Sequence, residues 1–334
     1  MNKPRIQKNT LAVLGMAGFL LGASPHASAQ LLIEENFNYT SGGNLYNNNG
    51  GTGFSGTWQH AVSSGTNYDT RATIVDGLTF AGLQTSAQAL QISSLSTGAT
   101  ISTSRTVNVT TPTATGTQVW GSFLFQNVTT PAAYNAHGGG AGTSWLLRFR
   151  DDPAGANTSK FNTYMYYAGD ASRAGPAVAA KDTTLGATST AGAFYDNQTY
   201  LFVTCLTVIS STSQRLDLWV LDAAGLASAR ADGLTVTSFD NYALLGGKRT
   251  VTSTSSLTPI ASGDNLVLVN YGWSGSGGST STFIIDELRY GLSAESVLPT
   301  AVPEPKTAAL WLSGVSAVLI LGLRIRKSRS SAQR

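Results

Sequence analysis

Short apolar runs separated by turn-forming residues dominate the middle of this sequence, and they favour an all-β fold. The runs are rich in Val, Ile, Phe, Tyr, Trp and Thr, and Gly, Asn, Asp, Ser or Pro residues bound them. No convincing helix with 3.6-residue apolar spacing occurs there. The clearest predicted strands are Gln118–Val128, Ser144–Arg150, Lys160–Tyr167, Gln198–Ile209, Arg215–Leu221, Asn265–Tyr271 and Thr282–Tyr290.

Two of these strands predict how the sheets are layered. In Arg215–Leu221, Leu216, Leu218 and Val220 alternate onto one face, with Asp217 on the other. Gln198–Ile209 is apolar on both faces, as in a strand at the centre of a layered structure. We therefore predict one domain over residues 30–298, a sandwich of about a dozen strands.

Composition excludes several other classes of protein. Charged residues make up 12% of the chain, and there is a single Cys and only three His. A disulfide framework or a multi-Cys zinc site is therefore excluded. The net charge of +3 comes from the two ends, because acidic residues outnumber basic ones between residues 31 and 303. Nucleic acid is accordingly not an expected partner.

The N-terminus has the three parts of a secretory signal peptide. A basic stretch precedes the apolar run Leu11–Leu21, and Ala27 and Ala29 form the small-residue site that signal peptidase accepts. The apolar run is too short for an ordinary membrane anchor. Residues 1–29 are therefore predicted to be removed, and the protein is predicted to be exported.

The C-terminus predicts a membrane segment. Residues 299–306 form a linker that contains Val302, Pro303, Glu304 and Pro305. An uncharged, mostly apolar segment, 307–323, is at the short limit for a spanning helix. The tail, 324–334, follows, and its basic residues would stay cytoplasmic and leave the domain outside. The orienting residues are Arg324, Arg326, Lys327 and Arg329.

The order of motif, span and basic tail resembles the PEP-CTERM sorting signal of Gram-negative bacteria. In that family an exosortase is thought to recognise the Val-Pro-Glu-Pro motif and to process the tail. The resemblance implies an inner-membrane-anchored intermediate, followed by release to the cell surface or extracellular matrix. A plain anchor behind a proline-stiffened linker is the alternative.

A second resemblance concerns the domain. Asn36–Trp58, Asp76–Leu83 with Ala89–Ile92, and Phe283–Gly291 are similar to segments of concanavalin A-like, laminin-G-like jelly rolls. Tyr200–Val208 followed by Asp217–Leu221 is similar to their central strands. The resemblance implies the fold only, because this fold carries lectins, glucanases and structural modules.

Catalytic motifs are weak in this chain. Gly51–Gly56 satisfies G-x-G-x-x-G, but without a preceding strand and a following helix it is interpreted as a loop. Glycoside hydrolysis needs two carboxylates at a set separation, and no E-x-D-x-x-E motif occurs. The acidic pairs are interpreted as divergent, solvated surface or turn residues: Glu34–Glu35, Asp151–Asp152 and Asp286–Glu287.

The remaining reactive residues are also interpreted structurally. His60 and His137 lack a G-x-S-x-G partner motif, so a serine hydrolase is disfavoured. Cys205 lies in an apolar strand and is predicted to be a buried, inert thiol. No cofactor is predicted. Calcium could use loop carboxylates such as Asp151, Asp152 or Asp264, but no EF-hand spacing assigns it.

Tryptophans are the candidates for sugar contact. Core packing is the expected role of Trp58, Trp120, Trp145 and Trp219. Trp273 enters a Gly/Ser-rich loop at a strand end and is the candidate glycan contact.

Three functions remain in view. The first is a non-catalytic surface or matrix protein, sorted by an exosortase and associated with extracellular polysaccharide. The second is a carbohydrate-binding, lectin-like adhesin module. The third is a polysaccharide hydrolase or lyase, which the missing carboxylate motif disfavours.

The C-terminal tail is predicted to be a sorting signal that is removed by processing. Replacing Pro303 and Glu304 together with Ala should leave full-length protein in the membrane of a host with an active exosortase, because the recognised motif is lost. Intact-mass measurement of the wild type and variant checks this. A wild type that keeps its tail in that host would contradict it.

Overall fold

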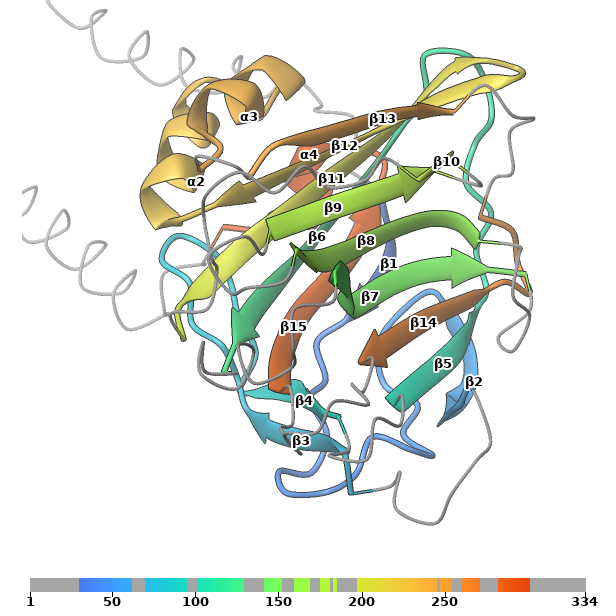
Figure 1. The fold of residues 1–334 in the computed structure, drawn as a ribbon, viewed down its shortest axis with the longest axis vertical. Helices are drawn as coiled ribbons and strands as arrows, with labels where there is room; N and C mark the ends of the chain where they lie inside the picture. Colours follow the sequence, from blue (N-terminus) through green and yellow to red (C-terminus); the bar gives the residue numbers. More distant parts are fainter. Residues whose placement is uncertain are drawn as a thin grey trace, which may run out of the picture.

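The protein is a sandwich of two antiparallel β-sheets, seen in a computed structural model (Figure 1). The structure describes residues 30–61, 70–94, 101–128, 141–151, 159–168, 175–180, 183–184, 197–244, 247–253, 260–270 and 282–300.

The larger sheet has eight strands in the order β13-β12-β11-β6-β15-β4-β3, with β1 also paired to β15. Its strands are β1 (Leu31–Glu35), β3 (Ala72–Asp76), β4 (Gln88–Ser93), β6 (Gln118–Asn127), β11 (Thr199–Ser210), β12 (Ser213–Leu221), β13 (Arg249–Ser253) and β15 (Thr282–Gly291). The smaller sheet has seven strands in the order β10-β9-β8-β7-β14-β5-β2. Its strands are β2 (Phe54–His60), β5 (Ile101–Val107), β7 (Ala141–Arg150), β8 (Ser159–Ala168), β9 (Gly175–Ala180), β10 (Thr183–Thr184) and β14 (Asn265–Asn270).

The chain passes repeatedly between the sheets, which makes the sandwich a jelly roll. β4, β5, β6 and β7 alternate between the larger and the smaller sheet. The last two strands then enter the middle of each sheet: β14 lies between β5 and β7, and β15 lies between β4 and β6. Both sheets are therefore completed by residues near the C-terminal end of the domain.

The predicted strands and their faces are confirmed. Each predicted segment coincides with an observed strand, with ends that differ by a few residues at most. In β12, Leu216, Leu218 and Val220 pack into the core between the sheets. In β11, Phe202 and Leu206 face that core, whereas residues of the opposite face belong to a second apolar cluster: Leu201, Val203 and Cys205.

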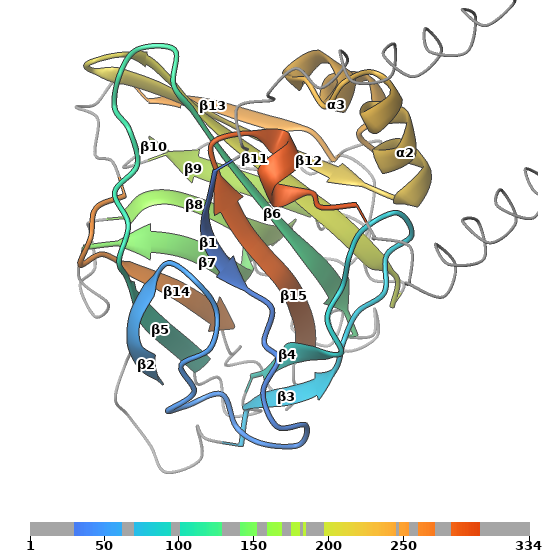
Figure 2. The same cartoon turned by 180° about the vertical axis from the view of Figure 1, so that it is seen from behind.

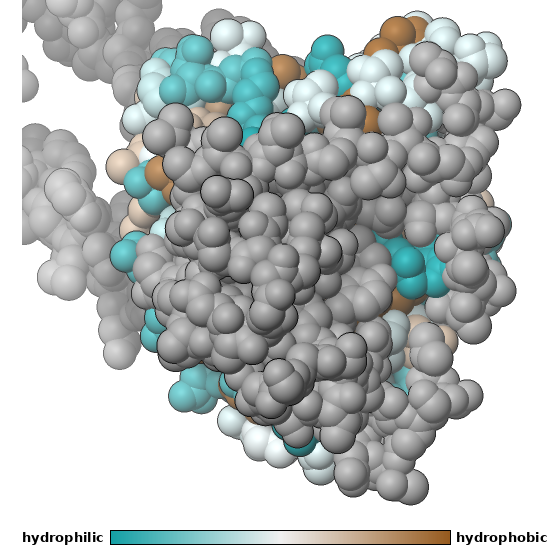
Figure 3. Space-filling model, viewed as in Figure 1, coloured by the Kyte–Doolittle hydropathy of each residue, from teal (hydrophilic) through white to brown (hydrophobic). Residues whose placement is uncertain are grey.

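The second cluster exists because helices cover the outer face of the larger sheet (Figure 2). These helices are α2 (Ala223–Ala231), α3 (Val236–Tyr242) and α4 (Ala294–Val297). The sequence shows no apolar helical period at these three helices. They are short, so no apolar period persists long enough to be recognised, although Asp222 and Thr235 cap the first two. The outward surface of the α2 and α3 corner is mainly hydrophilic (Figure 3).

The targeting segments predicted at the two ends of the chain lie outside the described residues. They are the signal peptide at the N-terminal end, and the Val302–Pro305 motif, the 307–323 span and the basic tail at the C-terminal end. Within the described part of the chain, no helix has the length and hydropathy needed to cross a membrane.

A buried ion pair joins the first strand to the smaller sheet. Glu35 on β1 and Arg105 on β5 are 2.9 Å apart between Oε2 and Nη1, and both side chains are almost fully buried. The same Oε2 accepts hydrogen bonds from the Tyr39 hydroxyl at 2.8 Å and from Trp58 Nε1 at 3.0 Å. The prediction that Glu35 is a solvated carboxylate was therefore wrong. Because it points into the sandwich, it needs these donors to offset its desolvation.

Glu35→Ala should destabilise the domain by about 3–5 kcal/mol, because it leaves a buried guanidinium unpaired. Urea unfolding followed by tryptophan fluorescence measures this loss. Lys248→Ala is the matched control: it removes an exposed ion pair with Asp240, and such pairs contribute about 0–1 kcal/mol. Equal losses in the two variants would contradict the structural role of Glu35.

Candidate ligand pocket at the bulge of β15

A β-bulge interrupts the central strand β15 where its neighbour changes. Thr282–Ile285 pair with β4, and Leu288–Gly291 pair with β1. The register with β6 shifts between Asp286 and Arg289. Glu287, inside the bulge, has a φ of 53°, a left-handed conformation that is uncommon outside glycine.

Asp286 is fully buried and ties the bulge to the segment between β3 and β4. Its Oδ2 accepts a hydrogen bond from the Leu78 amide at 2.9 Å. Its Oδ1 accepts from the Glu287 amide at 2.8 Å and from the Ser86 hydroxyl at 3.3 Å. Both oxygens are thus engaged by donors of the protein itself.

Glu287 and Glu34 share one arginine. The Arg289 Nη2 pairs with Glu287 Oε2, and Arg289 Nε pairs with Glu34 Oε1 at 3.0 Å. The Ser86 amide donates to the other oxygen of Glu287. Arg289 and Glu287 are buried, whereas Glu34 is about one-third exposed, at 31%. The arginine therefore has its charge balanced from two sides.

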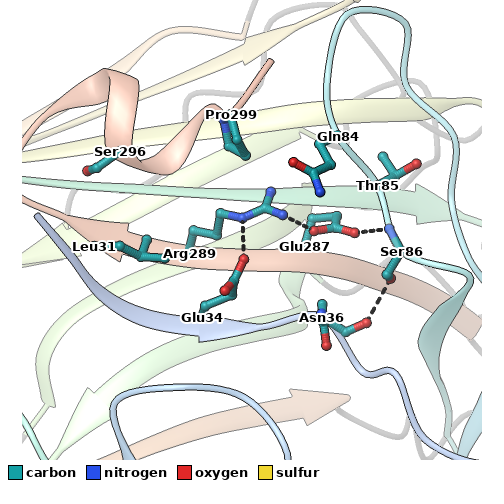
Figure 4. Close-up of a pocket in the computed structure, with 10 residues that line it drawn as sticks. All are labelled: Leu31, Glu34, Asn36, Gln84, Thr85, Ser86, Glu287, Arg289, Ser296 and Pro299. Atoms are coloured by element: carbon teal, nitrogen blue, oxygen red, sulfur yellow. Dashed lines mark hydrogen bonds and ion pairs between the residues drawn. The ribbon is translucent and has the colours of Figure 1, made fainter. Parts of the chain in front are cut away.

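One nitrogen of this arginine is buried without a hydrogen bond. Arg289 Nη1 donates to no group among the residues that the structure describes. Figure 4 shows it pointing between Gln84 and Pro299, away from both glutamates. A buried donor without an acceptor lowers the stability of the folded protein, because its desolvation is not offset. Such a group therefore marks a position where an acceptor atom of a ligand or water would be stabilising.

Arg289 lines a pocket of about 190 Å³, whose residues Figure 4 draws. Its lining is mostly polar and comes from β1, the 84–86 segment, β15 and the last residues of the domain. The lining residues are Leu31, Glu34, Asn36, Gln84, Thr85, Ser86, Glu287, Arg289, Ser296 and Pro299. Amide, hydroxyl and charged groups therefore converge on one small cavity.

The local electrostatics follow from burial. Desolvation, with a contribution from the Glu287 carboxylate, raises the pKa of Asp286 to about 8, although the Leu78 and Glu287 amides oppose this. Burial also raises the pKa of Glu287, and the charge of Arg289 works against that shift.

The prediction that Asp286 and Glu287 diverge into solvent was therefore wrong. It assumed regular alternation along the strand, and the left-handed residue at 287 breaks that alternation. Both acids consequently contact Ser86. Glu34 and Glu35 do take opposite sides as expected, one to Arg289 and the other to Arg105, but neither is simply solvated.

The G-x-G-x-x-G stretch is a loop only in its first half, because its last three residues already belong to strand β2. Thr52 bridges to Glu34, and a strand rather than a helix follows at Phe54. Gly51 and Gly53 have positive φ, and an added Cβ would lie 2.4 Å from Glu34 O and 2.2 Å from Leu32 O. These glycines therefore allow the loop to run close against β1.

The other candidate residues with described side chains, Cys205 and His60, lie in packed or stacked positions. Cys205 is buried, as predicted, and burial raises its pKa to about 12. His60 is exposed and stacks on Tyr46 with ring centroids 3.6 Å apart. His137 and Trp273 lie outside the described residues.

The tryptophans with described side chains pack in the interior, which confirms that expectation for Trp58, Trp120 and Trp219. The side chain of Trp145 is outside the described part.

The calcium candidates come together only in part. Arg150 pairs with Asn265 in antiparallel strands. Asp151, which follows Arg150, and Asp264, which precedes Asn265, therefore lie at the same end of the smaller sheet. Asp264 Oδ2 accepts a hydrogen bond from the Ala261 amide at 2.6 Å. Asp152 lies outside the described residues. In the described portion, no three His, Cys, Asp or Glu side chains converge to hold a metal ion.

Comparison with known proteins gives only distant similarities. No protein-family profile matches the sequence, and no curated protein matches it. The carbohydrate recognition domain of Emp47p is 9% identical, with 81% of this chain and 100% of that chain covered and a TM-score of 0.40. A lectin from Bauhinia forficata in complex with GalNAc is 12% identical, covering 70% and 95%, with a TM-score of 0.34. An endo-β-1,4-glucuronan lyase from Trichoderma reesei is 10% identical, covering 72% and 97%, with a TM-score of 0.35.

The buried acid in the bulge predicts a specific pH dependence. The folded protein holds a proton on Asp286 that the unfolded chain releases near pH 4, so its contribution to stability is complete at acid pH and is lost as the pH rises towards 8. The free energy of unfolding should fall by up to about 1.4 kcal/mol per pH unit across this window.

Asp286→Asn should flatten this dependence, because no proton can then be lost. Urea unfolding at pH 5, 6, 7 and 8 measures the slope. Lys248→Ala, which removes no acid, should keep the wild-type slope. A slope unchanged by Asp286→Asn would contradict the assignment.

Proposed function

We propose that the chain is an exported, non-catalytic carbohydrate-binding module, delivered to the cell surface or matrix by its C-terminal sorting signal. The observation that supports the binding function is Arg289 Nη1, which has no hydrogen-bond partner among the described residues and points between the pocket residues Gln84 and Pro299. The Arg289 side chain is 96% buried. Sugars present many hydroxyl oxygens that can accept from such a donor.

The lining supports a hydroxyl-rich ligand. Asn36 and Gln84 carry amides that both donate and accept, and Thr85 and Ser296 carry hydroxyls. A few precisely placed polar groups of this kind fix the orientation of a ligand in a small cavity. The pocket volume of about 190 Å³ suits one sugar unit rather than a long segment of polymer.

The hydrogen bonds made by the buried carboxylates of β15 support binding without catalysis. Asp286 and Glu287 are the buried acids of the bulge, and every one of their oxygens accepts a hydrogen bond or ion pair from the protein. General acid or base catalysis needs a carboxyl that can reach the glycosidic oxygen or a water. These two groups instead hold β15, the 77–88 segment and Arg289 together.

The sorting part of the proposal rests on the sequence. The signal peptide, the Val302–Pro305 motif, the 307–323 segment and the basic tail occur in the order that export followed by exosortase processing requires. Signal peptidase and an exosortase are the proposed processing partners, and extracellular polysaccharide is the proposed ligand.

Binding without turnover is the expected result. The full chain, purified in a zwitterionic detergent that carries no sugar, should bind at least one glycan on an array, and incubation should release neither reducing nor unsaturated ends. Sustained release of ends that a carboxylate substitution abolishes would contradict a non-catalytic role.

Gln84→Ala locates the site. Its side chain is exposed and lines the pocket, so its loss should weaken binding about 2–10-fold, the effect of one hydrogen bond. Trp273→Ala is the matched alternative. Binding that Trp273→Ala reduces and Gln84→Ala leaves intact would move the site to the 271–281 segment.

A further inference from the structure

The charge of the pocket bears on which sugars it could accept. Arg289 already has Glu287 on Nη2 and Glu34 on Nε, so two carboxylates face one guanidinium. The arginine therefore offers its free Nη1 as a hydrogen-bond donor, while its positive charge is more than balanced. The lining as a whole carries excess negative charge.

An anionic ligand would be repelled at this position. Any carboxylate or sulfate that accepted from Nη1 would be the third negative group around one guanidinium, whose charge the two glutamates already exceed, and excess like charge in a partly buried site disfavours binding. A neutral hydroxyl or ring oxygen can accept the same hydrogen bond without that repulsion.

The rest of the lining complements a neutral sugar. Gln84 lies beside the Nη1 position in Figure 4 and can bond to a further hydroxyl, whereas the Ser296 hydroxyl already donates to Ser293 O. Pro299 contributes an apolar ring to the same wall. It could contact the C–H face of a sugar.

We propose that this pocket selects neutral hexose units and rejects their uronic acid counterparts, with Glu34 as the specificity-determining residue. The proposal rests on the carbohydrate-binding function above. Glu34 is suited to this role because it is partly exposed, whereas Glu287 is buried behind Arg289 and braces the bulge. Removing the charge of Glu34 therefore changes the pocket without leaving a buried group unpaired.

Matched pairs of oligosaccharides test the selection. The pairs are glucan and glucuronan, galactan and galacturonan, and mannan and mannuronan oligosaccharides, each prepared with the same linkage and anomeric configuration. The members of a pair then differ only by oxidation of the C6 hydroxymethyl group to a carboxylate. Dissociation constants are measured by titration calorimetry on the full chain in the sugar-free detergent, at low and at physiological salt. The variants are Glu34→Gln, Gln84→Ala and, as a surface control, Lys248→Ala.

The neutral member of at least one pair should bind, and its acidic counterpart should bind at least about tenfold more weakly, with the gap larger at low salt. Glu34→Gln should reduce the gap to about threefold or less, whereas Lys248→Ala should leave it unchanged. Gln84→Ala should weaken the neutral ligand without altering the gap.

The outcomes separate the two proposals. A preference for the acidic member, or a gap that Glu34→Gln does not change, overturns the selection by Glu34 while carbohydrate binding stands. Binding that is insensitive to both pocket variants places the site elsewhere and overturns the inference. No binding of any member of the three pairs, or of any arrayed glycan, overturns the proposed function together with it.

Discussion

The need to satisfy ionisable groups inside the sandwich organises much of this structure. Strand β15 lies in the middle of the larger sheet and carries Asp286, Glu287 and Arg289, all buried. Burying such groups costs several kcal/mol for each unpaired charge, on the order given by effective desolvation penalties. The surroundings therefore have to supply partners, and these come from two separate segments: Leu78 and Ser86 before β4, and Glu34 on β1. The bulge is what allows consecutive acids to reach those segments.

The same requirement joins the two sheets at β1. Glu34 and Glu35 are adjacent, and strand alternation sends one outward to Arg289 and the other inward to Arg105 on the smaller sheet. One short strand thus bridges both charge networks, which explains why both of its acids are paired with arginines. The Arg289 network cannot be completed until β15, near the C-terminal end of the domain, is in place. The Glu35 network, in contrast, draws its partners Arg105, Tyr39 and Trp58 from the first part of the domain.

The sequence predicts the fold much better than it predicts the pocket, and the reason is physical. Strand positions follow from local apolar patterns, so β11 and β12 could be recognised with the correct faces inward. The pocket depends on a backbone feature, the left-handed φ of Glu287. A glycine at this position would have indicated such a conformation in the sequence, but a glutamate does not. It also depends on contacts such as Ser86 with Glu287, which are 201 residues apart. A usable signal was present nonetheless: in a chain with 12% charged residues, acids and an arginine inside the apolar run of β15 had to be paired.

The position of the pocket relative to the chain ends limits which glycans it can meet. The amide of Leu292 donates to Gln30 O at 3.0 Å, so the first and last parts of the domain run side by side. Pro299 forms a wall of the pocket, and the backbone amide of Gln84 donates a hydrogen bond to the Pro299 carbonyl at 3.1 Å. From Pro299 to the apolar segment that begins at Thr307, a fully extended chain spans at most about 30 Å. If the tail is anchored as we propose, the pocket therefore stays within that reach of the membrane and meets envelope sugars first. Removal of the tail would lift this restriction, so processing would change which polysaccharide the same pocket can bind without changing any residue that lines it.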